Sequence, residues 1–123
     1  VSLVWIGMPC NSWSSARHDV GGGGPRSAEF IYGKHELSPA DKVRVQIGNS
    51  TLRTACRVVS LCRKYKLPVC LENPATSLAW LAPNLKALLR HAHMSKSDYC
   101  QYGKPWRKRT LVATWNVAQD LLP

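Results

Sequence analysis

Acidic residues are scarce in this sequence. Seven Asp and Glu stand against seventeen Lys and Arg, which gives a formal net charge of +10. Such an excess is typical of proteins that bind polyanions, among which nucleic acid is the commonest. The alternative is a basic surface without such a partner. We expect nucleic acid, DNA in the first place, as the partner.

Long apolar stretches are missing as well. No run approaches the roughly 18 apolar residues of a membrane span, and the uncharged start lacks the basic region and long apolar core of a secretory signal. The five cysteines are an odd number without regular spacing, which disfavours a disulfide framework and favours a reducing compartment. We expect an intracellular protein, nuclear or cytoplasmic, that is neither secreted nor bound to a membrane.

Internal repeats and low-complexity tails are also absent, and the one biased segment is Gly21–Gly24. With 123 residues and 45% hydrophobic residues, the chain fits a single domain with a real core. It begins with Val1 inside a predicted strand, which suggests a fragment or an excised piece of a longer protein.

The order of apolar runs and turn signals predicts an α/β fold. Short, nearly continuous apolar runs indicate strands buried on both faces, and three-and-four spacing indicates helices. Strands alternating with helices favour a mostly parallel sheet with crossover helices. The segments are a strand at 1–8, a loop at 11–37, a helix from 38 to about 65, a strand at 67–71, helices at 77–81 and 83–91, a loop at 95–108, a strand at 110–115 and a helix from 117.

The long helix has a clear beginning. Ser38 is suited to the cap, Pro39 to the first helical position and Asp41 to the first turn. Gly48 and Asn49 predict a kink or break near the middle. The three-and-four spacing predicts a buried face made of Val43, Ile47, Thr51, Ala55, Val58, Cys62 and Tyr65.

Two chemically active residues follow the first two predicted strands. Cys10 comes just after the first and Glu72 just after the second. Parallel strands end at one edge of the sheet, where ligands bind, so we expect the two residues to share that edge. A thiol and a carboxylate can there act as nucleophile and proton carrier. The thiol needs a positive neighbour to lower its pKa, for which Arg17, Arg26 and the run 104–109 are candidates; the alternative is a buried, inert thiol.

Three segments resemble the DNA cytosine-5 methyltransferase family. Pro9–Arg17 (PCNSWSSAR) resembles its nucleophile segment Pro-Cys-Gln-x-Phe-Ser-x-Ala-x-Arg. Leu71–Pro74 (LENP) resembles its Glu-Asn-Val motif, and Asp98–Thr114 (DYCQYGKPWRKRTLVAT) is similar to the segment that holds Gly-x-Pro-Gln-x-Arg-x-Arg. Asn11 and Trp106 stand where the family has glutamine, and the two arginines fit only with a shift of one residue.

The resemblance implies a partial class-I-methyltransferase-like (Rossmann-like) catalytic domain over residues 1–123. The thiolate of Cys10 would add to C6 of a cytosine flipped out of the duplex. Glu72 would bind and protonate N3, and C5 would take a methyl group from S-adenosylmethionine. The implied substrate-binding residues are Asn73, Ser14, Arg17, Arg107 and Arg109, and Lys104, Trp106 and Lys108 would contact nucleic acid. Gly21–Gly24 would belong to the mobile catalytic loop, or is a plain flexible connection.

The sequence departs from the family in its cofactor site. The glycine-rich turn after a first strand and the acid after a second are both missing, as is a target-recognition domain. We therefore expect no methyl transfer by this chain alone, and keep a non-catalytic, basic nucleic-acid-binding module as the alternative. No metal is expected, because the spacing of His91, His93, Cys56, Cys62 and Cys100 matches no zinc pattern. Trp115 is expected in the core, whereas Trp80 and Trp106 could stack on bases.

Overall fold

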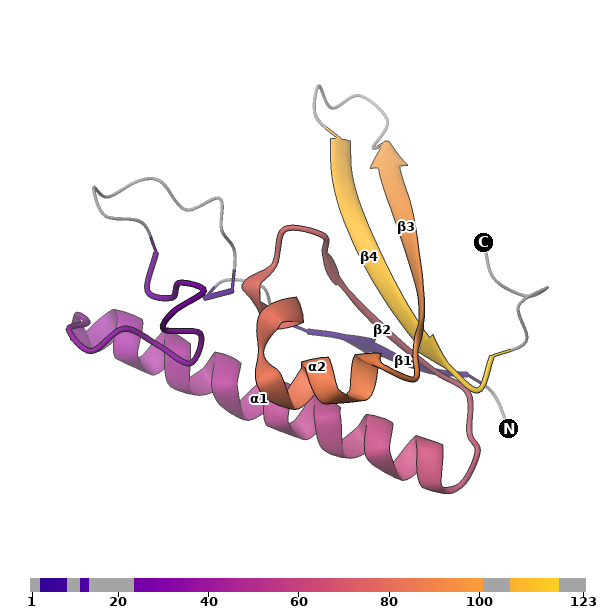
Figure 1. Ribbon diagram of the computed structural model, residues 1–123. Coiled ribbons are helices and arrows are strands. Elements are labelled where there is room, and N and C mark those ends of the chain that lie inside the picture. Colours follow the sequence, from indigo (N-terminus) through magenta and orange to yellow (C-terminus); the bar gives the residue numbers. More distant parts are fainter. Residues whose placement is uncertain (1–2, 9–11, 14–23, 101–106, 118–123) are drawn as a thin grey trace.

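The computed structural model describes residues 3–8, 12–13, 24–100 and 107–117. They form an α/β arrangement in which a four-stranded sheet packs against a helical layer (Figure 1). The elements are β1 (Val4–Gly7), α1 (Pro39–Lys64), β2 (Val69–Pro74), the 3-10 helix η1 (Leu78–Leu81), α2 (Pro83–Leu89), β3 (His93–Cys100) and β4 (Arg107–Trp115).

The first two strands are parallel, and the long helix α1 connects them. Val4 pairs with Val69 and Gly7 with Glu72. Alternate residues of the strands face the helices, because Val4, Ile6, Val69 and Leu71 belong to or pack against the same core as α1 and α2. The predicted strand–helix–strand unit is confirmed here.

The rest of the sheet corrects the prediction. The strand order is β1-β2-β4-β3, and both β2–β4 and β3–β4 are antiparallel, so a mostly parallel sheet is wrong. The segment 95–108, expected as a loop, supplies most of β3 and the start of β4. The strand β3 pairs only with β4 in this sheet, and such an edge strand can be polar, so it lacks the apolar signal of a buried strand. Only six residues separate β3 from β4, too few for the crossover that a parallel pair requires.

The helix α1 begins as predicted, with the Ser38 hydroxyl accepting a hydrogen bond from the Asp41 N–H. It continues as one helix through Gly48 and Asn49. The predicted buried face is confirmed at Ala55 and Cys62, but it is wrong at Val43 and Ile47, which are each 54% exposed. The buried residues keep three-and-four spacing along a line that differs from the predicted one in the first half of the helix: Val45, Gly48, Leu52, Ala55, Val59 and Cys62.

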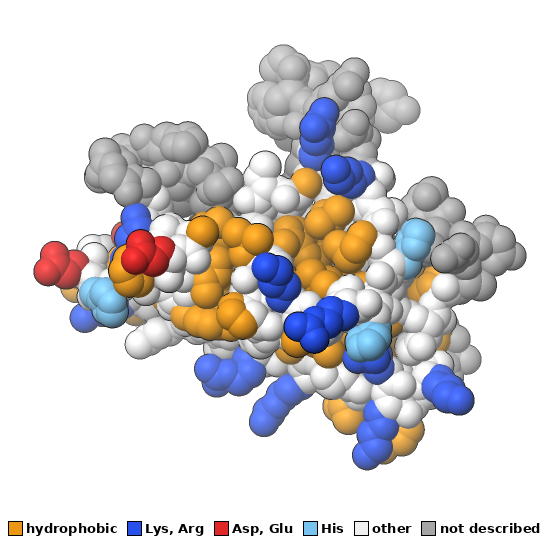
Figure 2. Space-filling view, in the orientation of Figure 1, with side chains coloured by type: hydrophobic (Ala, Val, Ile, Leu, Met, Phe, Trp, Pro, Cys, Tyr) orange, Lys and Arg blue, Asp and Glu red, His pale blue; other side chains and the backbone are white. Residues whose placement is uncertain are grey.

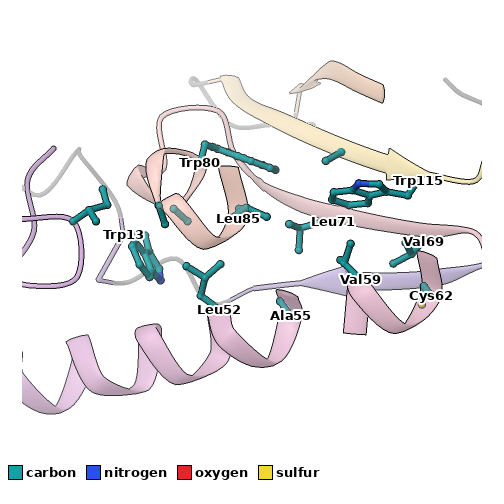
Figure 3. Close-up of a cluster of buried hydrophobic side chains, with 14 residues drawn as sticks. Trp13, Leu52, Ala55, Val59, Cys62, Val69, Leu71, Trp80, Leu85 and Trp115 are labelled. Atoms are coloured by element: carbon teal, nitrogen blue, oxygen red, sulfur yellow. The ribbon is translucent and has the colours of Figure 1, made fainter. Parts of the chain in front are cut away.

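The core lies between α1, the η1–α2 segment and the sheet (Figure 3). Trp115 is buried as expected, and its indole N–H donates to the Leu88 carbonyl. Trp80 is buried too, with its indole N–H on the Pro74 carbonyl, so base stacking by Trp80 is wrong. Cys62 and Cys70 are buried.

Two expectations of the sequence concern the ends and the membrane. The two helical segments after β2 are confirmed as η1 and α2, whereas the helix expected from Val117 extends into residues outside the described part. Among the described residues, no helix has the length and apolar character that crossing a membrane requires.

Candidate active site

The site forms where β1 and β2 end together. Gly7, the last residue of β1, pairs with Glu72, so the carboxyl ends of the two strands lie at one edge, as predicted. The strand β2 continues to Pro74, which places Glu72 and Asn73 inside the strand rather than after it. Since strand side chains alternate, Asn73 shares the helix-facing side with Leu71, and Glu72 lies on the far face of the sheet. Glu72 is half-buried and Asn73 is 2% exposed.

Cys10 lies outside the described residues, but the chain on both sides of it is fixed. Gly7, three residues before it, pairs with Glu72, and the carbonyl of Trp13, three residues after it, accepts a 2.8 Å hydrogen bond from the Leu78 N–H. Three residues of extended chain span at most about 11 Å. The described residues on either side, Gly7 and Trp13, thus contact the segment that runs from Glu72 to Leu78.

A buried arginine holds the chain that follows Cys10. The Arg26 guanidinium lies 3.4 Å from the ring centroid of Trp13 and is 4% exposed. Its Nε donates to the Ser12 carbonyl at 3.1 Å, and its Nη2 donates to the Ser12 hydroxyl at 2.9 Å. The remaining donors reach the Val45 and Ile31 carbonyls and the Asn49 side-chain oxygen, at 3.1, 2.9 and 2.6 Å.

The Arg26 guanidinium is thus hydrogen-bonded to uncharged oxygen atoms. Burial lowers its pKa from the ordinary value to about 10, so the group is still a cation at neutral pH. Arg26 was one of the cations expected to act on Cys10. Its hydrogen bonds go to Ser12, to Ile31 and to the helix residues Val45 and Asn49, so Arg26 positions Ser12 and Trp13 against α1.

Arg26 packs against Gly48 and is hydrogen-bonded to Asn49, both in the middle of α1. A Cβ atom on Gly48 would lie 2.6 Å from Arg26 Nη2 and 3.0 Å from Trp13 Nε1. The Asn49 amide accepts from Arg26 and donates to the Tyr32 carbonyl at 3.0 Å. Gly48 and Asn49 were expected to break the helix. Instead, the helix is continuous there, and Arg26 and Trp13 from the preceding segments pack on these two residues.

Unpartnered polar atoms gather at the carboxyl end of β2. Both amide atoms of Asn73 and the hydroxyl of Thr110 are buried and have no hydrogen-bond partner among the described residues. Thr110 pairs with Pro74, so these two residues lie at the same end of the β2–β4 pair. Since buried polar groups are usually bonded, these atoms can take partners from a ligand or from the part of the chain outside the described residues.

The third motif reaches the same end of the sheet. The Arg109 carbonyl accepts a 3.0 Å hydrogen bond from the Ala75 N–H, and Arg109 is exposed. The backbone of Arg107 and Lys108 extends β4 beyond the last pair, Pro74 with Thr110. The other predicted site residues, Ser14, Arg17, Lys104 and Trp106, lie outside the described residues, as does Gly21–Gly23.

Neither a metal nor the methyl donor fits the described residues. They contain no group of three His, Cys, Asp or Glu side chains that could hold a metal ion. Gly24 lies in a bend, and the next helix begins only at Pro39, so no glycine-rich strand–helix turn is formed there.

The sequence does not reveal Arg26 as a structural group, Gly48 and Asn49 as the residues it packs against, or Thr110 as a buried polar residue. The one hint in the sequence was a glycine in the middle of a well-capped helix, which can mark a place where another segment packs closely.

Comparison with family models, curated proteins and solved structures gives no match for this chain.

Proposed function

We propose that this chain is the nucleophile-bearing and base-binding part of a DNA cytosine-5 methyltransferase-like enzyme with a Rossmann-like origin. The observation that carries the proposal is the double attachment of the Cys10 segment. Gly7 pairs with Glu72 and Trp13 is bonded to Leu78, which supports the expectation that the Cys10 thiol and the Glu72 carboxylate share one edge of the sheet. Together with the motif resemblance, this favours addition chemistry on a pyrimidine.

The chemical step that these residues support is a covalent addition. The Cys10 thiolate forms a bond to C6 of a flipped cytosine, and the electron pair of the C5–C6 double bond moves toward C5 and the ring. The carboxyl group of Glu72 delivers the proton that N3 takes up. Proton donation at N3 stabilises the charge that develops in the ring as the thiolate adds.

Thr110 and the arginines complete the proposed pocket. Thr110 pairs with Pro74 and therefore shares the sheet face of Glu72, and its buried hydroxyl has no partner among the described residues, which suits it to a hydrogen bond with the base. Asn73 lies on the helix-facing side and would reach the base only at the open carboxyl end of the strand pair. Arg107, Lys108 and Arg109 follow β4 past the end of β2, where they can bind the phosphates beside the flipped nucleotide. Methyl transfer would require a donor site from elsewhere.

The test is adduct formation without a cofactor. Duplex DNA carrying 2-pyrimidinone at the target position can accept a thiol at the equivalent carbon, and the adduct is detected by intact mass and denaturing gel. We expect an adduct with the native chain, none with Cys10→Ser and a slower reaction with Glu72→Gln. Glu36→Gln, an exposed glutamate in the described loop, is the matched control and leaves the rate unchanged.

A second function is favoured by the missing donor site: a nucleic-acid-binding module without catalysis. It predicts DNA affinity that falls steeply with salt. It also predicts no adduct at any pH between about 7 and 9, the range around the pKa of a free thiol. That result would exclude the catalytic proposal.

A further inference from the structure

A groove of about 710 Å³ lies between α1 and α2, on the helical layer of the molecule. Its apolar surface includes Leu61 from α1 and Ala87 and Leu88 from α2, and Cys56 also lines it. Three cations, Arg53, Arg57 and Lys64, line it as well. In Figure 2, Lys and Arg side chains lie beside apolar surface over these helices.

The α1 side of the groove is a single stripe. Arg53, Arg57, Leu61 and Lys64 are spaced by four, four and three residues, which places them on one face of the helix. At 1.5 Å per residue the stripe is about 16 Å long, or three helical turns. It therefore matches the length of a short helix lying along it.

The cations of the groove have no acidic partner within the described part of the chain. The ion pair found on α1 joins Arg44 to Asp41, near the start of the helix. The Lys64 ammonium lies 5.5 Å from the ring centroid of Tyr65 instead of beside a carboxylate. Leu61 is 56% exposed between these charges. Apolar surface framed by positive charge is thus left open.

We propose that this groove binds an acidic, amphipathic helix of a partner protein. Leucine-type side chains of such a helix would cover Leu61 and Leu88, and its carboxylates would meet Arg53, Arg57 and Lys64. Nucleic acid fits less well, because its interfaces are polar and wet and would leave the apolar surface uncovered. A second copy of a chain with a net charge of +10 would bring like charges together.

The probe is a labelled helical peptide of Leu, Ala and Glu, about five turns long, with leucines at i, i+4, i+7 and i+11 and glutamates beside them. It is titrated with the full 123-residue chain and followed by fluorescence anisotropy. We expect saturable binding that weakens about tenfold or more in Arg57→Glu and in Leu61→Glu. Lys42→Glu makes the same charge change on α1 outside the groove and serves as control.

Several results would overturn this assignment. If Lys42→Glu weakens binding equally, net charge explains the binding and the groove does not. The same conclusion follows if a peptide of the same composition, with its leucines spread around the helix, binds equally well. Loss of DNA binding in Arg57→Glu without peptide binding would assign the groove to nucleic acid. A dimer that Leu61→Glu dissociates would assign it to a second copy. Circular dichroism verifies that each variant is folded, and Arg57→Glu decides alone if Leu61→Glu is not. The inference is independent of Cys10 chemistry.

Discussion

The backbone N–H of Leu78 donates a 2.8 Å hydrogen bond to the carbonyl of Trp13. This bond joins the segment after Cys10 to the segment after Glu72. Arg26 stacks on the Trp13 ring and supports the Trp13 side of this contact. A rigid support of this kind is what a nucleophile needs to be held in attack geometry. The first two predictions test that support.

Arg26→Lys should destabilise the protein although it keeps the charge. Lysine has three donors on a compact ammonium and cannot reproduce the planar fork that bonds Ser12, Ile31 and Val45. With buried acceptors left unbonded, we expect the free energy of unfolding to fall by about 2–3 kcal/mol in urea denaturation. Arg44→Lys, at an exposed arginine of α1, should change it by less than about 0.5 kcal/mol. Equal stability of the two variants would contradict the role of Arg26.

Gly48→Ala should destabilise a helix in which alanine is normally favoured. The new Cβ would lie 2.6 Å from Arg26 Nη2 and 3.0 Å from Trp13 Nε1, so the loop must move. Overpacking costs about 1–3 kcal/mol, and we expect the upper part of that range because buried groups of Arg26 and Trp13 meet the Cβ. That cost outweighs the helix-propensity gain of about 1 kcal/mol. Thermal melting measures it, with Ser50→Ala, exposed on the same helix, as a neutral control. A stabilised Gly48→Ala protein would show that the loop does not pack on Gly48.

Asn73→Leu separates stability from binding. Because neither amide atom has a partner among the described residues, its replacement should leave stability unchanged or raise it by about 1 kcal/mol. Adduct formation with the modified DNA should nevertheless be lost. Asn49→Leu is the contrast, since that amide is bonded to Arg26 and Tyr32, and it should cost about 2 kcal/mol or more. A strongly destabilised Asn73→Leu protein would mean that the amide has a structural partner.

The cysteines should differ in alkylation rate. Burial raises the pKa of the Cys56 and Cys70 thiols, so both carry less thiolate than a free cysteine at pH 8. Iodoacetamide followed by peptide mapping should label Cys10 first and Cys70 only on unfolding. The raised pKa also means that unfolding releases protons above about pH 8.5, so the stability that these thiols contribute is lost as the pH rises further. Preferential labelling of Cys70 in the folded protein would contradict its burial.

Particular residues show what the sequence could and could not predict. Ser38 and Pro39 fix the start of α1 through local chemistry, and the apolar runs fix β1 and β2, so the shared edge of Gly7 and Glu72 was predictable. The strand β3 was not, because a polar edge strand lacks the alternation that marks a half-buried one.

Two features of the site were hidden for a different reason. Arg26 is held largely by backbone carbonyls, which leave no signature in residue types. The low helix propensity of glycine suggested a break at Gly48. The close packing of Arg26 and Trp13 explains the glycine instead, and it puts Gly48 on the buried face of α1. These are effects of contacts between distant segments, which one sequence does not reveal.

The central claim, that Cys10 and Glu72 line one pocket, is tested most directly by cross-linking. Glu72→Cys is made in a Cys56→Ser background, and a bifunctional maleimide about as long as a nucleobase is wide is added at low protein concentration. The account predicts rapid intramolecular linkage between Cys10 and the introduced thiol, identified by peptide mapping, and none with Glu36→Cys in the same background. Linkage that is absent at position 72, or no faster there than at position 36, would contradict it.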